Sequence, residues 1–390
     1  RDVLTETVAC ADAPRAEPVE TAPGAAEMAA LEQFLAEARQ PIFVLGGSRW
    51  NMDARAAMMR FAEKFAVPVA TSYRRAPLFD ALHPNYAGDL GLGPNPKLLA
   101  RVKSADLVVV AGARMSEIMT QGYTLFDIPV PRTKLVHVYP DAGEIGRVYA
   151  PHLAIPATPQ RFAVALDALT PKNPGWAADV RAAHDDYLEW SGTPTPQPGE
   201  VNLGEIMVWL RENLPREAIL CNGAGNYAAW IHRFYRFREL ASHIAPTSAS
   251  MGYGVPAAVA MQRLYPERKI VSINGDGDFL MNGQEFATAV QFSLPILVLI
   301  FDNGIYGTIR MHQEREYPGR VSATTLRNPD FAAYARAFGG FGATVEKTGD
   351  FASAFRAAET SGQPAIIHVK FDPDGITPTM TLEKLRTRGK

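Results

Sequence analysis

Two short apolar runs, each followed by a small polar cluster, constrain the fold of this chain more than any other feature. Ile270–Ile273 leads into Gly275–Gly277, and Ile296–Phe301 leads into Asp302–Gly304. Apolar runs of this length, bounded by glycine and aspartate, are typical of strands buried in a parallel sheet. We therefore expect two strands that carry polar residues at their carboxyl ends.

The segment between the two runs predicts a helix. Asn282 stands three residues before Glu285, a pattern that opens helices, and Phe286, Ala289 and Val290 fall on one helical face. A strand–helix–strand crossover makes the two strands parallel, so their carboxyl ends meet at one edge of the sheet. Open α/β sheets bind ligands at that edge.

Asp276 and Asn303 each follow one of these strands, so we expect them to lie close together. A carboxylate and an amide oxygen suit Mg²⁺, which takes few protein ligands and keeps oxygens from a bound phosphate. Gly275 and Gly277 would let the backbone come close to that phosphate. The stretch therefore predicts a magnesium and phosphate site.

Three other interpretations compete with this one. An EF-hand loop starting at Asn274 would need glycine at its sixth position, where Phe279 stands. A strand–helix turn that binds nothing would use the same residue types. A dinucleotide-binding fingerprint could lie at Gly223–Ala228, after the strand-like Ile219–Cys221. That motif needs an acidic residue ending a second strand about 20 residues further on, and Glu239 lies in a stretch that looks helical instead.

Composition excludes several functional classes. The 390 residues carry a formal charge of −2, which gives no reason to expect nucleic acid or an anionic membrane as partner. No apolar run is long enough to span a membrane, and the first residues show no signal-peptide pattern. Cys10 and Cys221 have no metal or redox spacing, and the histidines form no zinc motif. These features predict a cytoplasmic protein.

The pattern of strands and helices predicts an α/β protein with two doubly wound parallel-sheet domains. Residues 25–170 and residues 201–390 both alternate apolar strands with amphipathic helices, and the proline- and glycine-rich residues 171–200 are interpreted as a linker around a polar helical stretch. Besides the runs above, the predicted strands are Ile42–Leu45, Val67–Ala70, Leu107–Ala111, Leu135–Val138 and Ala365–Val369.

At these residues the chain resembles the thiamine-diphosphate (ThDP) enzymes of the acetolactate synthase and benzoylformate decarboxylase kind. Their signature is Gly-Asp-Gly, a spacer and an asparagine, which stand here as Gly275–Gly277 and Asn303. In such enzymes the aspartate, the asparagine and a backbone carbonyl two residues later bind the metal. The resemblance therefore implies Asp276, Asn303 and Ile305 as ligands. It covers nearly the whole chain, more loosely before residue 200.

The resemblance also implies how the chain is organised. Enzymes of this kind have a pyrimidine-binding domain, a central domain and a pyrophosphate-binding domain. Residues 1–24 resemble a linker that follows the first domain, so 25–170 would be the central domain and 201–390 the pyrophosphate and Mg²⁺ domain. The catalytic glutamate of the first domain has no counterpart here, so the catalytic residues stay unknown. The complete protein would be a homodimer or homotetramer, and this chain alone is expected to be inactive.

Several positions can be carried over from the family to the ThDP site. The loop at Gly225 would approach the diphosphate, Ala249 would accept a hydrogen bond from the cofactor's amine, and Met251 would wedge between its two rings. A helix cap for Asn226 and a core position for Met251 stay open. Asp278 replaces the small polar residue often found after the signature, and should face the metal's waters or point away. The implied cofactor-binding residues are Gly225, Asn226, Ala249, Met251, Gly252, Gly275, Gly277, Asp278, Phe279 and Tyr306.

The resemblance implies a ThDP- and Mg²⁺-dependent 2-keto acid decarboxylase or carboligase, without deciding between them. Acetolactate synthases carry a tryptophan where His312 stands, and pyruvate decarboxylases a glutamate where Ile309 stands. The central domain matches the FAD-binding one at Gly112–Arg114 but departs from it at Met115–Glu117, which argues against FAD. The alternatives are an NAD-dependent dehydrogenase, and a non-catalytic module that binds a nucleotide or ThDP and regulates a partner.

Overall fold

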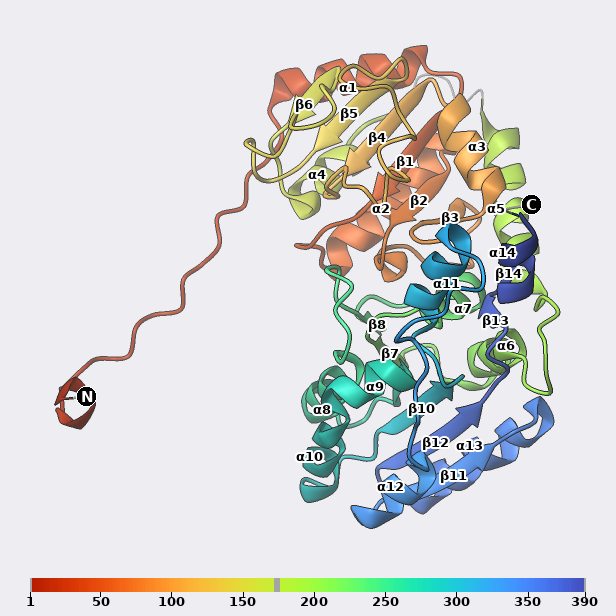
Figure 1. Cartoon of the computed structure of the whole chain (residues 1–390). Helices are drawn as coiled ribbons and strands as arrows, with labels where there is room; N and C mark the ends of the chain where they lie inside the picture. Colours follow the sequence, from red (N-terminus) through yellow and green to blue (C-terminus); the bar gives the residue numbers. More distant parts are fainter. Residues whose placement is uncertain (1, 172–175, 389–390) are drawn as a thin grey trace.

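The computed structural model describes residues 2–171 and 176–388, which form two α/β domains, one above the other in Figure 1. A short 3₁₀ turn, η1 (Asp2–Thr5), precedes the first domain. Residues 6–24 have no regular structure, and most of them run away from the rest of the molecule (Figure 1).

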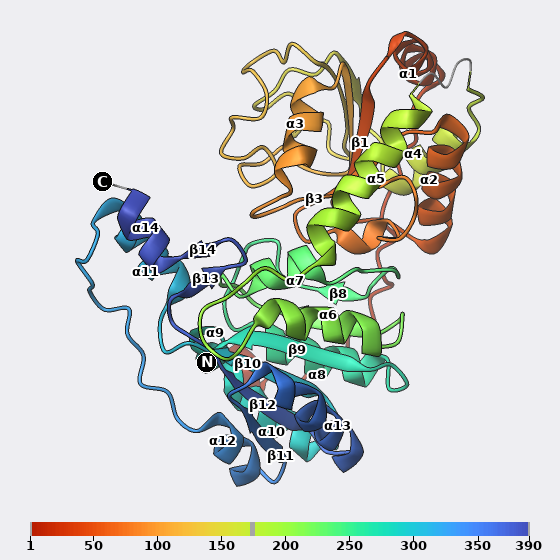
Figure 2. The ribbon, with the colours of Figure 1, turned by 90° about the vertical axis from the view of Figure 1, so that its right-hand side faces the viewer.

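The first domain is built on a six-stranded sheet in the order β3-β2-β1-β4-β5-β6, and all its strands are parallel. Helices cover both faces, which explains why β1 and β4 are apolar without interruption (Figure 2). The strands are β1 (Pro41–Leu45), β2 (Val69–Ser72), β3 (Tyr86–Leu90), β4 (Leu107–Ala111), β5 (Lys134–Val138) and β6 (Leu153–Ile155). The helices are α1 (Ala25–Glu37), α2 (Met52–Phe65), η2 (Ala76–Leu78), α3 (Pro96–Ser104), α4 (Pro159–Asp167) and α5 (Ala177–Gly192).

The second domain has a parallel six-stranded sheet in the order β11-β12-β10-β9-β7-β8. The chain moves outward from β7 to β8 and then crosses back to β9, so the switch point of this sheet lies between β7 and β9. The strands are β7 (Ile219–Asn222), β8 (His243–Ile244), β9 (Ile270–Gly275), β10 (Leu297–Asp302), β11 (Phe341–Val345) and β12 (Ala365–Lys370), and β13 (Gly375–Thr377) pairs with β14 (Met380–Thr381) as a small antiparallel ladder.

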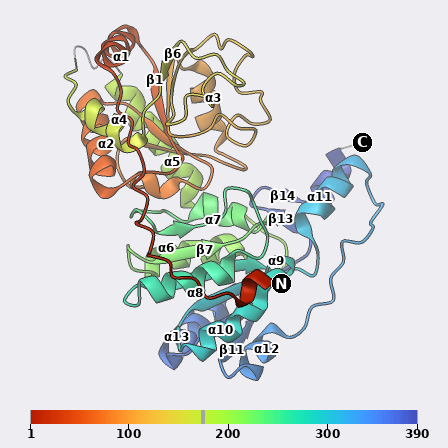
Figure 3. The same cartoon turned by 90° about the vertical axis from the view of Figure 1, so that its left-hand side faces the viewer.

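Helices cover the second sheet as they cover the first (Figure 3). The helices between α5 and the loop after β10 are α6 (Leu203–Asn213), α7 (Ala228–Phe234), α8 (Gly254–Leu264), α9 (Asp276–Asn282), η3 (Gly283–Glu285) and α10 (Phe286–Gln291). The remaining ones are α11 (Gly307–Glu316), α12 (Phe331–Ala337), η4 (Thr348–Asp350), α13 (Phe351–Ser361) and α14 (Leu382–Arg388).

The prediction of two doubly wound parallel-sheet domains is confirmed, and every predicted strand is present. One strand is shifted: β2 begins at Val69, because the amide of Val67 bonds to Ala62 O and closes helix α2. Four strands of the two sheets escaped prediction, namely β3, β6, β8 and β11. They are short, or they contain glycine and polar residues, so no clear apolar run marks them.

The predicted start of the helix after β9 is wrong. Helix α9 begins at Asp276, directly after the strand, and Asn282 is its last residue, whose side chain makes no capping hydrogen bond to the following η3. The Asn282 side chain donates to Gly252 O, while Glu285 accepts from Thr288. Phe286 and Ala289 are buried in α10, as the apolar face predicted. The acidic signature residue therefore lies in the first turn of a helix, not in a free turn.

Helix α5 belongs to the region interpreted as a linker, and it joins the two domains (Figure 2). In its middle, the Tyr187 ring packs edge-to-face on Tyr86 of β3, with 4.8 Å between centroids. Near its end, the guanidinium of Arg233 from α7 lies 3.6 Å from the centre of the Trp190 ring. These two contacts connect β3 of the first domain to α7 of the second.

Candidate functional site

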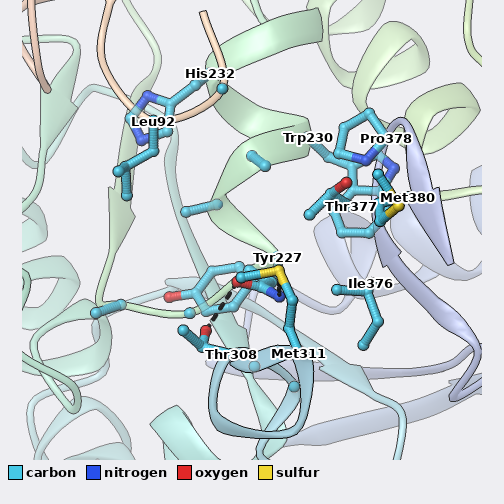
Figure 4. Close-up of a pocket in the computed structure, with 18 of the residues that line it drawn as sticks. Leu92, Tyr227, Trp230, His232, Thr308, Met311, Ile376, Thr377, Pro378 and Met380 are labelled. Atoms are coloured by element: carbon cyan, nitrogen blue, oxygen red, sulfur yellow. Dashed lines mark hydrogen bonds between the residues drawn. The ribbon is translucent and has the colours of Figure 1, made fainter. Parts of the chain in front are cut away.

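The loops that follow β7, β9 and β10 meet at the carboxyl edge of the second sheet, beside its switch point. There they line a cavity of about 1230 Å³, which the first domain borders through Tyr73 and Arg74. Figure 4 shows Trp230, Thr377, Pro378 and Met380 gathered on one side and His232 near Leu92 on the other. The cavity wall is mainly apolar, with a few polar groups at its base, as in small-molecule sites.

Asp276 and Asn303 both border this cavity, as their positions after β9 and β10 predict. The Asp276 carboxylate is almost entirely buried. Among the described residues, the one donor to its Oδ1 is the amide of Gly277, at 2.9 Å. Its Oδ2 accepts from Gly304 N at 3.0 Å and from Asn328 Nδ2 at 2.7 Å. The ligand Ile305, which the family resemblance implies, also lines the cavity.

The electrostatics of Asp276 and the neighbouring Asp302 favour a bound cation. Burial raises the pKa of Asp276 to about 7, and the neighbouring Asp302 adds to the rise. For Asp302 burial acts in the same direction, but hydrogen bonds with His368, Asp276 and Asn328 outweigh it and lower its pKa. Among the described residues, no lysine or arginine forms an ion pair with Asp276. A buried carboxylate with free lone pairs, at a cavity that Asn303 also lines, fits a hard divalent ion.

The signature glycines have a packing reason in addition to the predicted phosphate contact. A Cβ atom on Gly277 would lie 2.5 Å from the ring of Tyr306, and one on Gly275 would lie 2.9 Å from the ring of Tyr227. Both rings come from loops that line the cavity. Larger residues at either glycine would push these loops away from the start of α9.

Asp278, in the first turn of α9, connects two loops of the site. Its buried carboxylate accepts from Tyr227 Oη at 2.6 Å, from Gly252 N at 2.7 Å and from Ala224 N at 3.3 Å. Burial raises its pKa, although these hydrogen bonds and the positive charge of Arg74 oppose the rise. The carboxylate thus points to the loop after β7 and to the loop before α8.

The structure decides two alternatives left open for single residues. Asn226 does not cap α7 with its side chain, because its Oδ1 accepts from Thr308 and its Nδ2 faces the sulfur of Met311 in α11. Met251 is not a core residue, since 38% of it is exposed. The roles of both toward a cofactor stay predictions.

The other predicted positions divide into two groups. Gly225, Ala249 and Tyr306 line the cavity together with Asn226 and Met251. Ala249 has a left-handed backbone with φ of 57°, which turns the chain in front of α8. The side chain of Phe279 points into the core, where its ring packs on Phe331, and Gly252 lies behind the wall with its amide on Asp278. Only main-chain atoms of these last two could contribute to a site.

Sequence reasoning missed several groups around the cavity. Asn328 reaches the site from the long loop before α12, and His368 donates from β12 to Asp302 at a nitrogen–oxygen distance of 2.7 Å. Arg74 donates from the first domain to Gly223 O and Pro246 O, each at 2.6 Å. None of them belongs to a local motif. A polar histidine in the buried run of β12 is the one signal that the sequence offered.

Two competing interpretations disagree with this geometry. The EF-hand loop is wrong, because Asp276 starts a helix and Asn274 remains in β9, where it bonds to Ser272. In the dinucleotide interpretation, β8 would have to end in an acidic residue, but Ala245 and Pro246 follow it. Glu239 comes before β8, in a stretch that is not helical, contrary to the prediction. In the described part of the chain, no helix is both long and apolar enough for a membrane span.

Comparison with known proteins agrees with the site. The central domain of thiamine pyrophosphate enzymes matches residues 28–166, and their C-terminal TPP binding domain matches residues 223–369. The acetolactate synthase large subunit of Corynebacterium glutamicum is 27% identical over 91% of this chain and 58% of its own length. The isozyme 2 large subunit of Escherichia coli is 27% identical over 92% of this chain and 66% of its own length.

A relative that is not named an acetolactate synthase matches this chain to a similar degree. The sulfoacetaldehyde acetyltransferase of Alcaligenes xylosoxydans is 25% identical over 86% of this chain and 60% of its own length. The chain thus spans roughly six tenths of the length of the relatives it matches. Both sheet-containing domains match the family, so the chain belongs to the thiamine pyrophosphate enzymes and carries their central domain and their C-terminal TPP-binding domain.

Proposed function

We propose that this protein takes part in a ThDP- and Mg²⁺-dependent reaction of a small 2-keto acid, either decarboxylation or carboligation. The observation that carries the proposal is the Asp276 carboxylate, which is buried at a cavity next to Asn303 and forms no ion pair with a cationic side chain among the described residues. Membership in the thiamine pyrophosphate enzymes supports the cofactor.

The residues present fit both groups. Asp276 Oδ1, the side chain of Asn303 and the carbonyl of Ile305 would hold Mg²⁺, which prefers oxygen ligands. The loops at Gly225 and Ala249 border the same cavity and would hold ThDP, with Met251 exposed to it. When bound, ThDP takes up the electron pair released as the keto acid loses CO₂. The task of this chain is to anchor the cofactor and to exclude water with its apolar wall.

The relatives' names support transfer or ligation more than simple decarboxylation. They denote acetolactate synthases and an acetyltransferase. His312 and Ile309 lie on α11 at the cavity, where they differ from the tryptophan and the glutamate expected of synthases and pyruvate decarboxylases. The acceptor would therefore differ from that of either enzyme.

We also propose that the central domain does not hold FAD. In a sheet of order 3-2-1-4-5-6, a dinucleotide binds between the ends of the first and fourth strands. Here the backbone segments after β1 and β4 lie so close together that a Cβ on Gly47 would collide with Gly112 O. The Trp50 indole donates to Gly46 O and closes the same edge further.

The complete protein is proposed to be a homodimer or homotetramer, with a pyrimidine-binding domain supplied outside these residues and catalytic groups that are not in this chain. This chain alone would then be inactive, and turnover of pyruvate or benzoylformate by the purified chain would contradict that. The cytoplasmic location expected from the cysteine count stays a prediction.

Isothermal titration of ThDP, with and without Mg²⁺, tests the proposal. We expect binding that requires Mg²⁺ and that is lost in Asp276→Ala. Titrations of NAD and FAD into the same chain are the comparison. Tight NAD binding that survives Asp276→Ala would favour a dehydrogenase. Magnesium-dependent ThDP binding without turnover, even after a pyrimidine-binding domain is supplied, would favour a regulatory module.

A further inference from the structure

A segment of the long loop between α11 and α12 lies across the loop that follows Asn303. Residues 324–328, here called the strap, pair with it as a short antiparallel ladder. The amide of Tyr306 donates to Thr324 O at 2.9 Å, and the amide of Leu326 donates to Gly304 O at 2.8 Å. The strap is also tied to α11, because Arg310 donates to the hydroxyl of Thr324 at 2.7 Å.

This ladder determines where the Ile305 carbonyl points. Ile305 faces Thr325 across an isolated antiparallel bridge, and the two hydrogen bonds of the ladder belong to the residues on either side of Ile305. In an antiparallel pair of this kind, the peptide groups of the facing residues point away from the partner segment. The Ile305 carbonyl is therefore directed away from the strap and is free for another partner.

Asn328, at the end of the strap, bridges two carboxylates. Its Nδ2 lies 2.7 Å from Asp276 Oδ2 and 2.7 Å from Asp302 Oδ1. The amide of Gly304 donates to the same two oxygens, at 3.0 and 2.9 Å. Shared N–H groups thus hold two carboxylate oxygens side by side. Without these donors, the charged forms of the two carboxylates would repel each other.

The same contacts decide which oxygen remains for a cation. Asp302 uses its second oxygen on the buried His368, so this carboxylate is fully occupied. Asp276 keeps Oδ1, whose one donor in the described part of the chain is the neighbouring amide of Gly277. The carboxylate that Asn328 and Gly304 hold at one oxygen therefore presents the other oxygen to the cavity.

The orientation of Asn328 has an energetic penalty that supports a dedicated role. Its own Oδ1 is buried and has no hydrogen-bond partner within residues 2–171 and 176–388. Leaving such an oxygen unpaired is unfavourable, so the amide takes this orientation because both carboxylates require its N–H groups.

From these contacts we infer that Asn328 is a positioning residue of the cation site, which sets divalent-cation affinity by aligning Asp276 through the strap. The inference rests on the proposed function, since the cation is the one proposed above. Asn328 acts through Asp276 and does not itself bind the ion. Partners that orient a metal ligand typically contribute 10–100-fold to metal affinity.

Mn²⁺ is a suitable probe, because the signal of the free ion in electron paramagnetic resonance reports binding directly without turnover. Titrations are made with the full chain at saturating ThDP, on wild type, Asn328→Ala and Thr325→Ala. We expect Asn328→Ala to weaken Mn²⁺ binding about 10-fold or more. Thr325→Ala, which changes a strap side chain that does not touch the carboxylates, is expected to bind within about twofold of wild type.

The melting temperature without metal shows whether each variant is folded. Should Asn328→Ala unfold, Asn328→Leu keeps the side-chain volume without the N–H donors and is expected to show the same loss. An Asn328 variant that is folded and binds Mn²⁺ as tightly as wild type overturns the inference alone. A wild-type chain that takes up no Mn²⁺ with ThDP contradicts the proposed function as well.

Discussion

His232 allows a test of how strongly the junction of the two domains is desolvated. The side chain lies at the end of α7 and borders the cavity, but its Nε2 is buried without a hydrogen-bond partner. Its ring packs 5.7 Å from the ring of Tyr73 and 5.7 Å from that of His243. Burial, together with the positive charge of Arg74, lowers the pKa of His232 to about 3.

This pKa makes stability depend on pH with a definite sign. At pH 5 the imidazole of the unfolded chain, with a pKa near 6.5, is almost fully protonated, whereas the folded His232 stays neutral. Unfolding therefore takes up a proton, and the free energy of unfolding falls as the pH drops from 7 to 5. Because pH 5 lies about 1.5 units below the unfolded pKa, His232 alone lowers stability by about 2 kcal/mol.

His232→Gln removes the titrating group while keeping a polar side chain of similar length. Urea unfolding at pH 7 and pH 5 is the measurement, and the loss of stability between them should be about 2 kcal/mol smaller in the variant than in wild type. Tyr73→Phe changes the neighbouring ring without removing an imidazole, so its stability should shift equally at both pH values. If His232→Gln lost as much stability as wild type, the desolvation of this ring would be refuted.

Two further predictions concern the cysteines and one close backbone contact. Burial raises the pKa of the Cys221 thiol, so a thiol reagent such as DTNB should titrate only Cys10 in the native chain and both cysteines after unfolding; two reactive thiols in the native chain would contradict this. Gly47→Ala should destabilise the first domain by at least about 4 kcal/mol in urea unfolding, because Gly47 has a left-handed backbone and the added Cβ would collide with Gly112 O. Gly122→Ala, also left-handed but in open space, should lose only about 1–2 kcal/mol, and equal losses for both variants would show that the contact is absent.

Burial explains which parts of the fold could be predicted from the sequence. Strands β4, β9 and β10 are buried along almost their whole length. β4 and β10 are therefore apolar runs between polar residues, and in β9 Ser272 alone interrupts the run Ile270–Ile273. Strand β8 has two residues and β11 lies half-exposed at the sheet edge, so neither produces such a pattern. The start of the helix after β9 was predicted wrongly for another reason. Asn282 and Glu285 have the spacing of a cap, but the Asn282 side chain makes a tertiary contact with Gly252 O and Glu285 accepts locally from Thr288.

The candidate site shows a similar division. Asp276 and Asn303 could be placed together because each directly follows a strand, and a parallel sheet brings the ends of its strands to one edge. Asn328 lies 52 residues after Asp276 in a loop without regular structure, so no periodic pattern leads to it. Arg74 comes from the other domain, and only the packing of the two domains brings it to Gly223.

The three carboxylates around the start of α9 show why one of them is left for a cation. Asp278 is compensated by two backbone amides and the hydroxyl of Tyr227, and Asp302 by His368. Asp276 keeps an oxygen with a single donor, and burial makes its charge unfavourable. The second oxygens of Asp278 and Asp302 are held by the side chains of Tyr227 and His368, whereas the donor at Asp276 Oδ1 is the adjacent amide of Gly277. A cation at Asp276 Oδ1 would therefore stabilise a buried charge that no side chain reaches at this oxygen among the described residues. That difference is the physical reason to expect the cation at this residue and not at its neighbours.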